Sequence, residues 1–101
     1  MPESNPIIVT AHLWTHPGKR TEFTAFEEQA FEIMRNHGAE IVEIRASKPL
    51  EPEGPDETHV LRFPSRQAFD SYRADPRLTA LAPQRDHCIT DTRVEIAEVV
   101  D

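Results

Sequence analysis

Alternating and helical patterns of hydrophobic residues divide the chain into predicted strands and helices. Residues 7–15 alternate between two fairly apolar sets of positions, which is typical of a central strand covered on both sides. From about residue 19 to residue 37, apolar residues recur at three- and four-residue spacing, which predicts an amphipathic helix. Gly38 follows as a predicted C-terminal cap, because glycine takes the left-handed backbone conformation without strain.

A second strand is predicted over residues 39–47. Its apolar positions are Val42, Ile44 and Ala46, and its polar positions are Glu43 and Arg45. Residues 48–56, which follow, are rich in proline and acidic side chains and predict a long loop between two strands. Two interpretations of this loop are open, a lid over a ligand site or plain surface.

The third predicted strand, residues 57–63, ends at Pro64, which lacks a backbone donor. Ser65 is the predicted N-cap of a helix. The buried side of that helix carries Ala68, Phe69 and Tyr72. Asp75 is the predicted N-cap of a short helix that begins at Pro76 and that Pro83 is expected to end, with Leu78 and Leu81 on its apolar side. The last strand is predicted over residues 92–100, with Val94 and Ile96 on one face.

The order strand–helix–strand–strand–helix–strand predicts an α+β, ferredoxin-like domain with a four-stranded antiparallel sheet, spanning residues 1–101 as one domain. Right-handed crossovers place the first and third strands in the centre and both helices on one face. The opposite face is then predicted to carry Ile8, Thr10, His12, Trp14, Arg45, Val60 and Arg62. A face with a tryptophan and several aliphatic residues is a poor surface for a monomer, so we expect a homodimer that packs two such faces together.

The amino-acid composition argues against several classes of binding partner. The 101 residues carry a net charge of −7, which argues against binding nucleic acid or an anionic membrane surface. No apolar stretch approaches the ~20 residues of a membrane span, and the N-terminus has no signal-peptide pattern. The single cysteine, Cys88, cannot form an intrachain disulfide, which is consistent with a cytoplasmic protein.

Five residues are candidates for a ligand site. His59 and Tyr72 are expected beside the helices, where they would line a cleft and where His59 would act as a general base; the alternative is ordinary core packing. Arg85 would bind a carboxylate through its planar guanidinium, or form a surface ion pair. His12 and Trp14 share a strand face, and either contact a ligand or pack in a dimer interface. The five histidines show no metal-binding spacing, so no metal site is predicted.

Several short segments in fixed order resemble a known family. They are the Pro17-Gly18 turn, the long helix ending at Gly38, Phe63-Pro64-Ser65 followed by Ala68-Phe69, and then Asp75-Pro76, Leu81 and Arg85. Together they resemble the dimeric α+β barrel superfamily, and within it the branch catalogued as domain of unknown function 1330. The resemblance implies a homodimer whose two sheets form a barrel with the helices outside. It implies no established reaction.

Related branches of this superfamily include cofactor-independent oxygenases, haem-degrading enzymes, lactone isomerases and stress proteins. This sequence departs from the haem-degrading pattern at three positions, where it carries Ala11, Tyr72 and Ala82. We therefore expect a dimeric protein that needs no cofactor and binds a small aromatic or acidic metabolite between helix and sheet. The alternatives are a cofactor-independent monooxygenase or isomerase, and a non-enzymatic stress-associated dimer.

Overall fold

Four antiparallel strands form a single sheet in the part of the chain that the computed structural model describes, residues 5–46 and 53–100. The strands are β1 (Ile7–Thr15), β2 (Glu40–Ala46), β3 (Glu57–Phe63) and β4 (Ile89–Glu98). Their order in the sheet is β2-β3-β1-β4, so β1 and β3 are central as predicted. Both central strands begin and end at the predicted residues.

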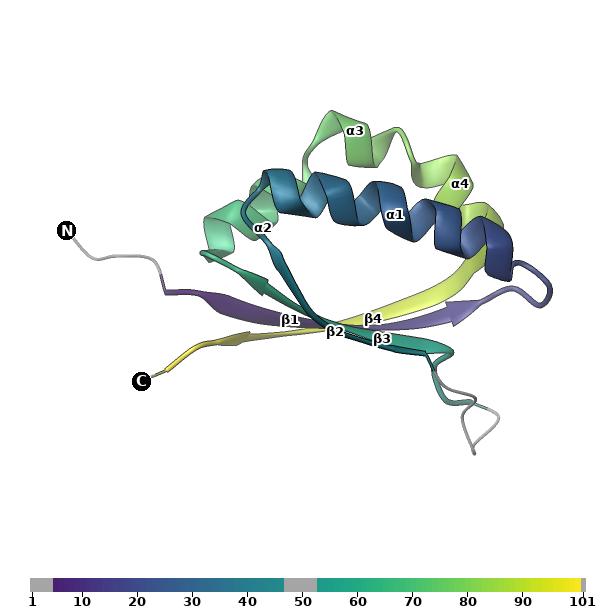
Figure 1. Cartoon of the computed structure of the whole chain (residues 1–101), viewed down its shortest axis with the longest axis horizontal. Coiled ribbons are helices and arrows are strands. Elements are labelled where there is room, and N and C mark those ends of the chain that lie inside the picture. Colours follow the sequence, from purple (N-terminus) through teal and green to yellow (C-terminus); the bar gives the residue numbers. More distant parts are fainter. Residues whose placement is uncertain (1–4, 47–52, 101) are drawn as a thin grey trace.

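All the helices of the described chain lie on one face of this sheet (Figure 1). They are α1 (Arg20–Asn36), α2 (Arg66–Arg73), α3 (Pro76–Thr79) and α4 (Ala82–Cys88). The α+β, ferredoxin-like class and the strand order are confirmed. The opposite face of the sheet has no helix over it (Figure 1). No helix in the described residues is long and apolar enough to cross a membrane.

The helix boundaries follow from local chemistry. Gly38, just past α1, has φ of 82°, the left-handed conformation predicted for it. The Ser65 side chain accepts a hydrogen bond from the Ala68 backbone N–H at 3.0 Å and caps α2. Asp75 caps α3 by accepting from the Arg77 backbone N–H at 2.9 Å. Each cap satisfies a backbone donor that has no partner inside its helix.

The prediction that Pro83 ends a helix is wrong. Pro83 lies in the first turn of α4, where a proline is tolerated because its missing N–H would have no intrahelical partner. The helix α4 continues from there and ends at Cys88. The last strand also begins earlier than predicted, at Ile89 instead of Thr92, and ends at Glu98.

A β-bulge in β2 changes the predicted face of one residue. The register pairs Ile41 with Leu61 and then Glu43 with Val60, so Val42 is an extra residue without a partner. After the bulge, Ile44 lies opposite His59 on the helix-covered face. The expectation that Val42 and Ile44 belong to one regular alternating face is therefore wrong. Val42 is 54% exposed.

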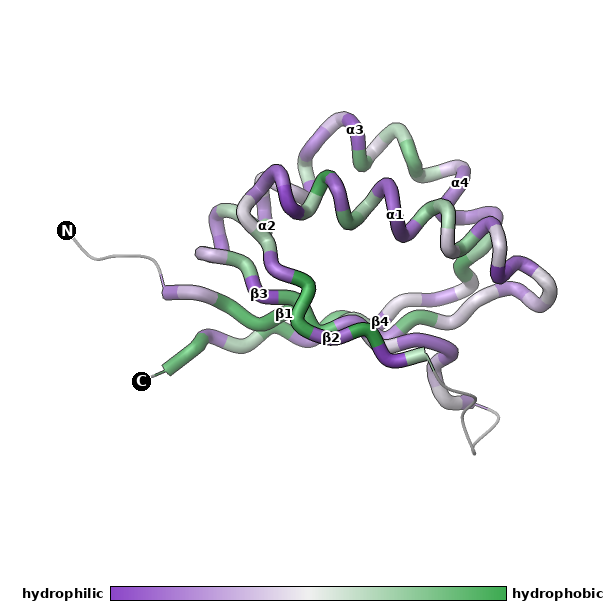
Figure 2. The backbone as a smooth tube through the Cα atoms, viewed as in Figure 1, coloured by the Kyte–Doolittle hydropathy of each residue, from purple (hydrophilic) through white to green (hydrophobic). Residues whose placement is uncertain are grey.

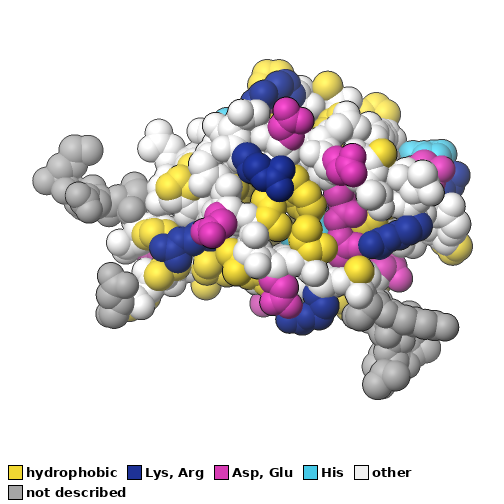
Figure 3. Space-filling view, in the orientation of Figure 1, with side chains coloured by type: hydrophobic (Ala, Val, Ile, Leu, Met, Phe, Trp, Pro, Cys, Tyr) yellow, Lys and Arg dark blue, Asp and Glu magenta, His cyan; other side chains and the backbone are white. Residues whose placement is uncertain are grey.

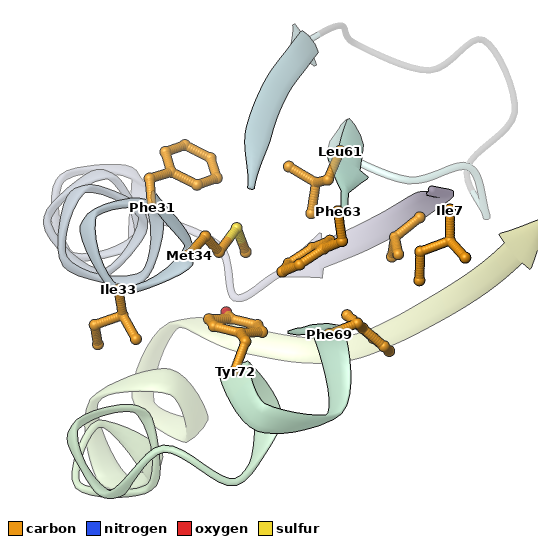
Figure 4. Packing of buried hydrophobic residues seen from close by; sticks show 9 residues of the cluster. Ile7, Phe31, Ile33, Met34, Leu61, Phe63, Phe69 and Tyr72 are labelled. Atoms are coloured by element: carbon orange, nitrogen blue, oxygen red, sulfur yellow. The ribbon is translucent and has the colours of Figure 1, made fainter. Parts of the chain in front are cut away.

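The hydrophobic core fills the space between the helices and the sheet. Figure 4 shows Phe31 and Met34 of α1 and Tyr72 of α2 pointing toward the side chains of β3. The rings of Phe63 and Phe69 meet edge to face, with centroids 5.2 Å apart. Such an aromatic pair contributes about 0.5–1.5 kcal/mol beyond its buried area. Figure 2 shows the matching pattern along the chain, with hydrophobic positions in the strands and mixed polarity along α1.

Candidate functional site

The core is interrupted by a cavity of about 320 Å³ between the helices and the sheet. Its walls come from α1, α2, α3, α4 and three strands, and they are mainly apolar, including Phe23, Phe26, Phe31, Met34, Leu61 and Phe69. In Figure 3, hydrophobic side chains gather between α1 and the sheet, bordered by acidic side chains toward the start of α1. A cavity of this volume and lining is of the size that holds a small organic ligand.

One cross-strand row forms the floor of the cavity. His59 of β3, Ala11 of β1 and Val94 of β4 lie side by side, because Ala11 pairs with both of the others. The neighbours of Ala11 on the same face of β1, Val9 and Leu13, are large and buried. The single methyl group of Ala11 leaves the space above the middle of the row open. His59 therefore lies at one end of the cavity floor and the half-exposed Val94 at the other.

Three buried ionisable groups meet at the His59 end. The His59 Nε2 atom lies 2.6 Å from Glu57 Oε1 and 2.8 Å from Glu27 Oε2. His59 is 5% exposed, Glu27 8% and Glu57 1%. The only cationic side chain in contact with this cluster in the described structure is that of Arg20, whose Nη2 atom is 2.7 Å from Glu57 Oε2. Buried charges are stable only when they are paired in this way.

Burial and mutual contacts shift the pKa of each member of the cluster. Burial raises the pKa of Glu27 from 4.5 to about 7, an effect that the hydrogen bond to His59 only partly offsets. Burial would also raise the pKa of Glu57, but hydrogen bonds from Glu27, His59 and Arg20 lower it below its ordinary value. Burial would lower the pKa of His59, but its hydrogen bonds to Glu27 and Glu57 raise it. Near neutral pH, Glu57 is thus the fixed anion, and Glu27 and His59 hold the exchangeable protons.

The hydrogen bonds also distinguish the two ring nitrogens of His59. Nε2 faces both carboxylates, whereas Nδ1 has no hydrogen-bond partner among the described side chains. A carboxylate that holds one ring N–H leaves the other nitrogen to exchange a proton with a ligand. Two carboxylates and one imidazole within 4.8 Å would also suit a divalent cation. Here the Arg20 guanidinium already balances Glu57, and we interpret the cluster as a proton-binding one.

The opposite side of the cavity is cationic. Arg73 of α2 and Arg85 of α4 both line it, together with the buried Tyr72. Arg85 Nη2 donates a hydrogen bond to Thr92 Oγ1 on β4 at 2.6 Å, which holds the guanidinium over that strand. Burial raises the pKa of Tyr72 to about 12, although both arginines act to lower it. Its hydroxyl therefore stays protonated and can donate a hydrogen bond.

The five residues predicted from the sequence are divided between the two faces of the sheet. His59, Tyr72 and Arg85 all line the cavity. His12 lies on the other face, where its Nδ1 is 3.2 Å from Thr58 Oγ1 and its Nε2 is 3.3 Å from Glu95. The Trp14 indole N–H, also on that side of β1, donates to the Glu53 carbonyl at 2.8 Å. Neither His12 nor Trp14 lines the cavity described above.

Two residues of the cluster were missed from the sequence. Glu27 lies within the apolar stripe of α1, four residues after Phe23 and three before Ala30. Glu57 lies two residues before His59, which places both side chains on the same strand face. An acidic residue at a predicted core position is an informative signal, because burying it requires a partner. Residues 47–52 of the proposed lid lie outside the described residues.

Comparison with known proteins assigns the family. The family described as a domain of unknown function, DUF1330, matches residues 11–100. The chain belongs to the DUF1330 family. The resemblance inferred from the sequence is therefore confirmed, and it covers nearly the whole chain. No curated protein matches it.

Solved structures with the same fold include proteins both with and without a described activity. This DUF1330 chain is similar to a protein of unknown function from Rhodopseudomonas palustris, with a TM-score of 0.80, 16% identity and coverage of 97% and 85% of the two chains. It is similar to a dabb family protein with a ferredoxin-like fold from Mesorhizobium loti, with a TM-score of 0.72, 15% identity and coverage of 96% and 99%. It is also similar to SnoaB, a cofactor-independent oxygenase from Streptomyces nogalater, with a TM-score of 0.72, 10% identity and coverage of 97% and 96%. At these identities the likeness is one of fold.

Proposed function

We propose that this protein binds a small aromatic or acidic metabolite in the cavity and transfers a proton to or from it through His59. The observation that carries the proposal is the position of His59, at the end of an apolar cavity with its Nε2 held by Glu57 and Glu27. An imidazole whose orientation is fixed by two carboxylates, and whose pKa their hydrogen bonds raise, is well suited to exchange a proton with a ligand.

The elementary step is the removal of a proton from an acidic carbon or hydroxyl of the ligand. The His59 Nδ1 atom accepts the proton, and the ligand keeps the bonding electron pair as an enolate or phenolate. Return of the proton to a neighbouring atom completes an isomerisation. Addition of molecular oxygen to the anion, with O₂ as the co-reactant, would begin a cofactor-independent oxygenation, the activity described for SnoaB. Both alternatives share the first step, and the step needs only residues of this chain.

The proposal includes a homodimer formed through the face of the sheet that carries His12 and Trp14. Support comes from the absence of a described helix over that face and from its aliphatic side chains, such as Ile8 and Val60, whose residues are only partly buried in the single chain. It also includes a cytoplasmic location, supported by the single, buried thiol of Cys88. The cavity lies on the other side of the sheet.

Deuterium exchange tests the proton transfer. Enolisable aromatic ketones and 2-oxo acids are incubated with the protein in D₂O, and NMR follows the loss of the acidic C–H signal. We expect exchange above the buffer rate for at least one compound, and its loss in His59→Gln. Exposed Glu28 of α1 provides a matched control, and Glu28→Gln should exchange like the wild type. Exchange that persists in His59→Gln, or binding without exchange for every compound, would overturn the catalytic role and favour a non-enzymatic binding protein.

A further inference from the structure

The polar groups of the cavity are separated into two ends of different character. The Glu27–His59–Glu57 cluster occupies the end above β3, Arg85 lies over β4, where it contacts Thr92, and Tyr72 and Arg73 line the cavity from the end of α2. The wall between them is apolar. We propose that the cavity selects a small aromatic monocarboxylate, with its carboxylate at Arg85 and Arg73 and its reactive group at His59. This inference rests on the proposed function and adds the class and orientation of its substrate.

Arg85 is positioned to bind an anion in a fixed orientation. Its Nη2 hydrogen bond to Thr92 ties α4 to β4 and uses one of the N–H groups of the guanidinium. The nearest carboxylate recorded for it in the described structure belongs to Asp86, whose Oδ1 is 3.8 Å from Nη1 and whose side chain is 77% exposed. That contact is longer than a hydrogen bond. The remaining N–H groups are thus free to pair with a carboxylate in the planar geometry that arginine favours.

Tyr72 and Arg73 complete this end of the cavity. They are successive residues near the C-terminus of α2, and both line the cavity. Both arginines line the same cavity as Tyr72, and both act electrostatically to lower the pKa of its hydroxyl. A ligand carboxylate beside that hydroxyl would meet two cations and one neutral donor. A neutral ligand of the same shape would leave both cations without a counterion.

The sheet register sets the length of the ligand. From His59 to Val94 the floor crosses two strand spacings, which is about 10 Å. A carboxylate held near the β4 side therefore lies too far from His59 to be the group that exchanges the proton. At the His59 end the cations Arg20 and His59 are already paired with Glu57 and Glu27, so a ligand carboxylate there would meet no unpaired cation among the described residues. The ligand that fits both ends is a monoanion with an uncharged, weakly acidic group at its far end.

Matched pairs of probes test the inference without knowledge of the natural substrate. We would compare 3-phenylpropanoate with 3-phenylpropanamide, and phenylpyruvate with its amide, by ligand-observed NMR and calorimetry. Each pair shares its shape and differs in charge. The wild type should bind each carboxylate at least about tenfold more tightly than its amide, since a charge-assisted contact contributes about 1.5–3 kcal/mol. In Arg85→Met the carboxylate should lose about tenfold and the amide little, because methionine retains much of the apolar bulk.

Two further variants provide a second test of the anion-binding end and a matched control. Arg73→Met should reduce the carboxylate preference in the same direction, and it does so independently of the Arg85–Thr92 hydrogen bond. Arg66 begins the same helix but pairs with Asp70 at 3.1 Å on the surface and does not line the cavity, so Arg66→Met should bind like the wild type. Circular dichroism confirms that each variant is folded before its binding is compared.

The outcomes separate this inference from the proposed function. Equal binding of carboxylates and amides by the wild type, or an equal loss of both in Arg85→Met and Arg73→Met, overturns the anion-binding end. No binding of any probe at millimolar concentration overturns it too. If the amide probes bind as tightly as the carboxylates and neutral ketones still exchange deuterium through His59, the proposed function is supported. The preference for a carboxylate is then contradicted. If the wild type catalyses no exchange but still prefers carboxylates to amides, the proposed function is contradicted and the anion-binding end is supported.

Discussion

Ala11 of β1 pairs directly with His59 of β3, and its methyl side chain leaves the space beside the imidazole unfilled. The same position pairs on its other side with Val94 of β4. A larger residue at this one position would occupy the middle of the cavity floor. The access of a ligand to His59 therefore depends on the size of a single side chain.

The first prediction is that Ala11→Phe abolishes ligand binding and keeps the fold. The ring would enter existing space, so we expect a change in unfolding free energy within about 1–2 kcal/mol of wild type, and a gain if the ring fits well. Thermal unfolding and ligand-observed NMR measure the two effects. Ala25→Phe on the exposed side of α1 is the matched control, and it should bind like the wild type. A variant that binds ligands normally would show that the cavity above Ala11 is not the site.

The second prediction concerns the pH dependence of stability. The pKa of Glu27 is about 7 in the folded protein and 4.5 without the fold, so between these values the folded state binds more protons than the unfolded state. His59, whose pKa is also raised, acts in the same direction. The free energy of unfolding should therefore fall as the pH rises from about 5 to about 8. Urea titrations followed by circular dichroism at several pH values measure this slope.

Glu27→Gln provides the internal comparison for that slope. It removes the carboxylate that must ionise in a buried site, so the variant should lose less stability on going to about pH 8 and be about 1–3 kcal/mol more stable there than the wild type. Glu28→Gln on the exposed side of α1 should follow the wild type. A wild-type stability that rises between pH 5 and pH 8, with no difference in Glu27→Gln, would contradict the buried pairing described for the cluster.

The third prediction uses the single tyrosine of the chain as a reporter. Since Tyr72 is the only tyrosine, the tyrosinate absorbance of the whole protein reports this one hydroxyl. Its pKa of about 12 means that absorbance should stay low at alkaline pH where a free tyrosine, with a pKa of about 10, is already ionised. In Arg85→Met the ionisation should move to still higher pH, because a cation that stabilises the phenolate has been removed. Ionisation at the pH of a free tyrosine would show that Tyr72 is not buried in the cavity wall.

Much of the fold follows from residue patterns. The apolar run of 7–15 and the short run 57–63 before Pro64 identified both central strands, and Ser65, Asp75 and Gly38 marked helix ends because their chemistry suits only a few backbone positions. The helix α4 was missed because a proline can either end a helix or lie in its first turn, and only packing against the rest of the fold, here chiefly α1, decides between them. The bulge at Val42 is likewise a property of strand pairing and has no local signal.

The candidate site was predictable only in part, for a similar reason. His59, Tyr72 and Arg85 could be placed near one another because their elements and faces were known. Glu57 shares a strand face with its neighbour His59, but Glu27 is 30 residues from Glu57 in the sequence and joins them only when α1 is laid across β3. Strand alternation already predicted His12 and Trp14 on the face without helices, and they lie there, away from the cavity.

The fourth prediction concerns assembly. If the face that carries Thr10 and Val60 packs against a second copy, sedimentation should show a mass about twice 11.5 kDa. Val60→Glu would place a charge in that interface and should produce a monomer, because an unpaired buried charge is costly. Ala25→Glu, on the exposed side of α1, should remain dimeric. A wild-type protein that sediments as a monomer at micromolar concentration would rule out the proposed homodimer.

The buried Glu27–His59–Glu57 cluster has a further consequence for how this protein tolerates change. Replacing a buried ionic cluster by apolar side chains of similar volume often leaves a fold as stable or makes it more stable. Random mutagenesis selected for stability alone should therefore accept apolar residues at these three positions and a larger residue at Ala11. Selection for the protein's biological activity should reject the same substitutions. The two selections would then disagree at a small, contiguous set of residues, and that disagreement would outline the functional site without any knowledge of the substrate.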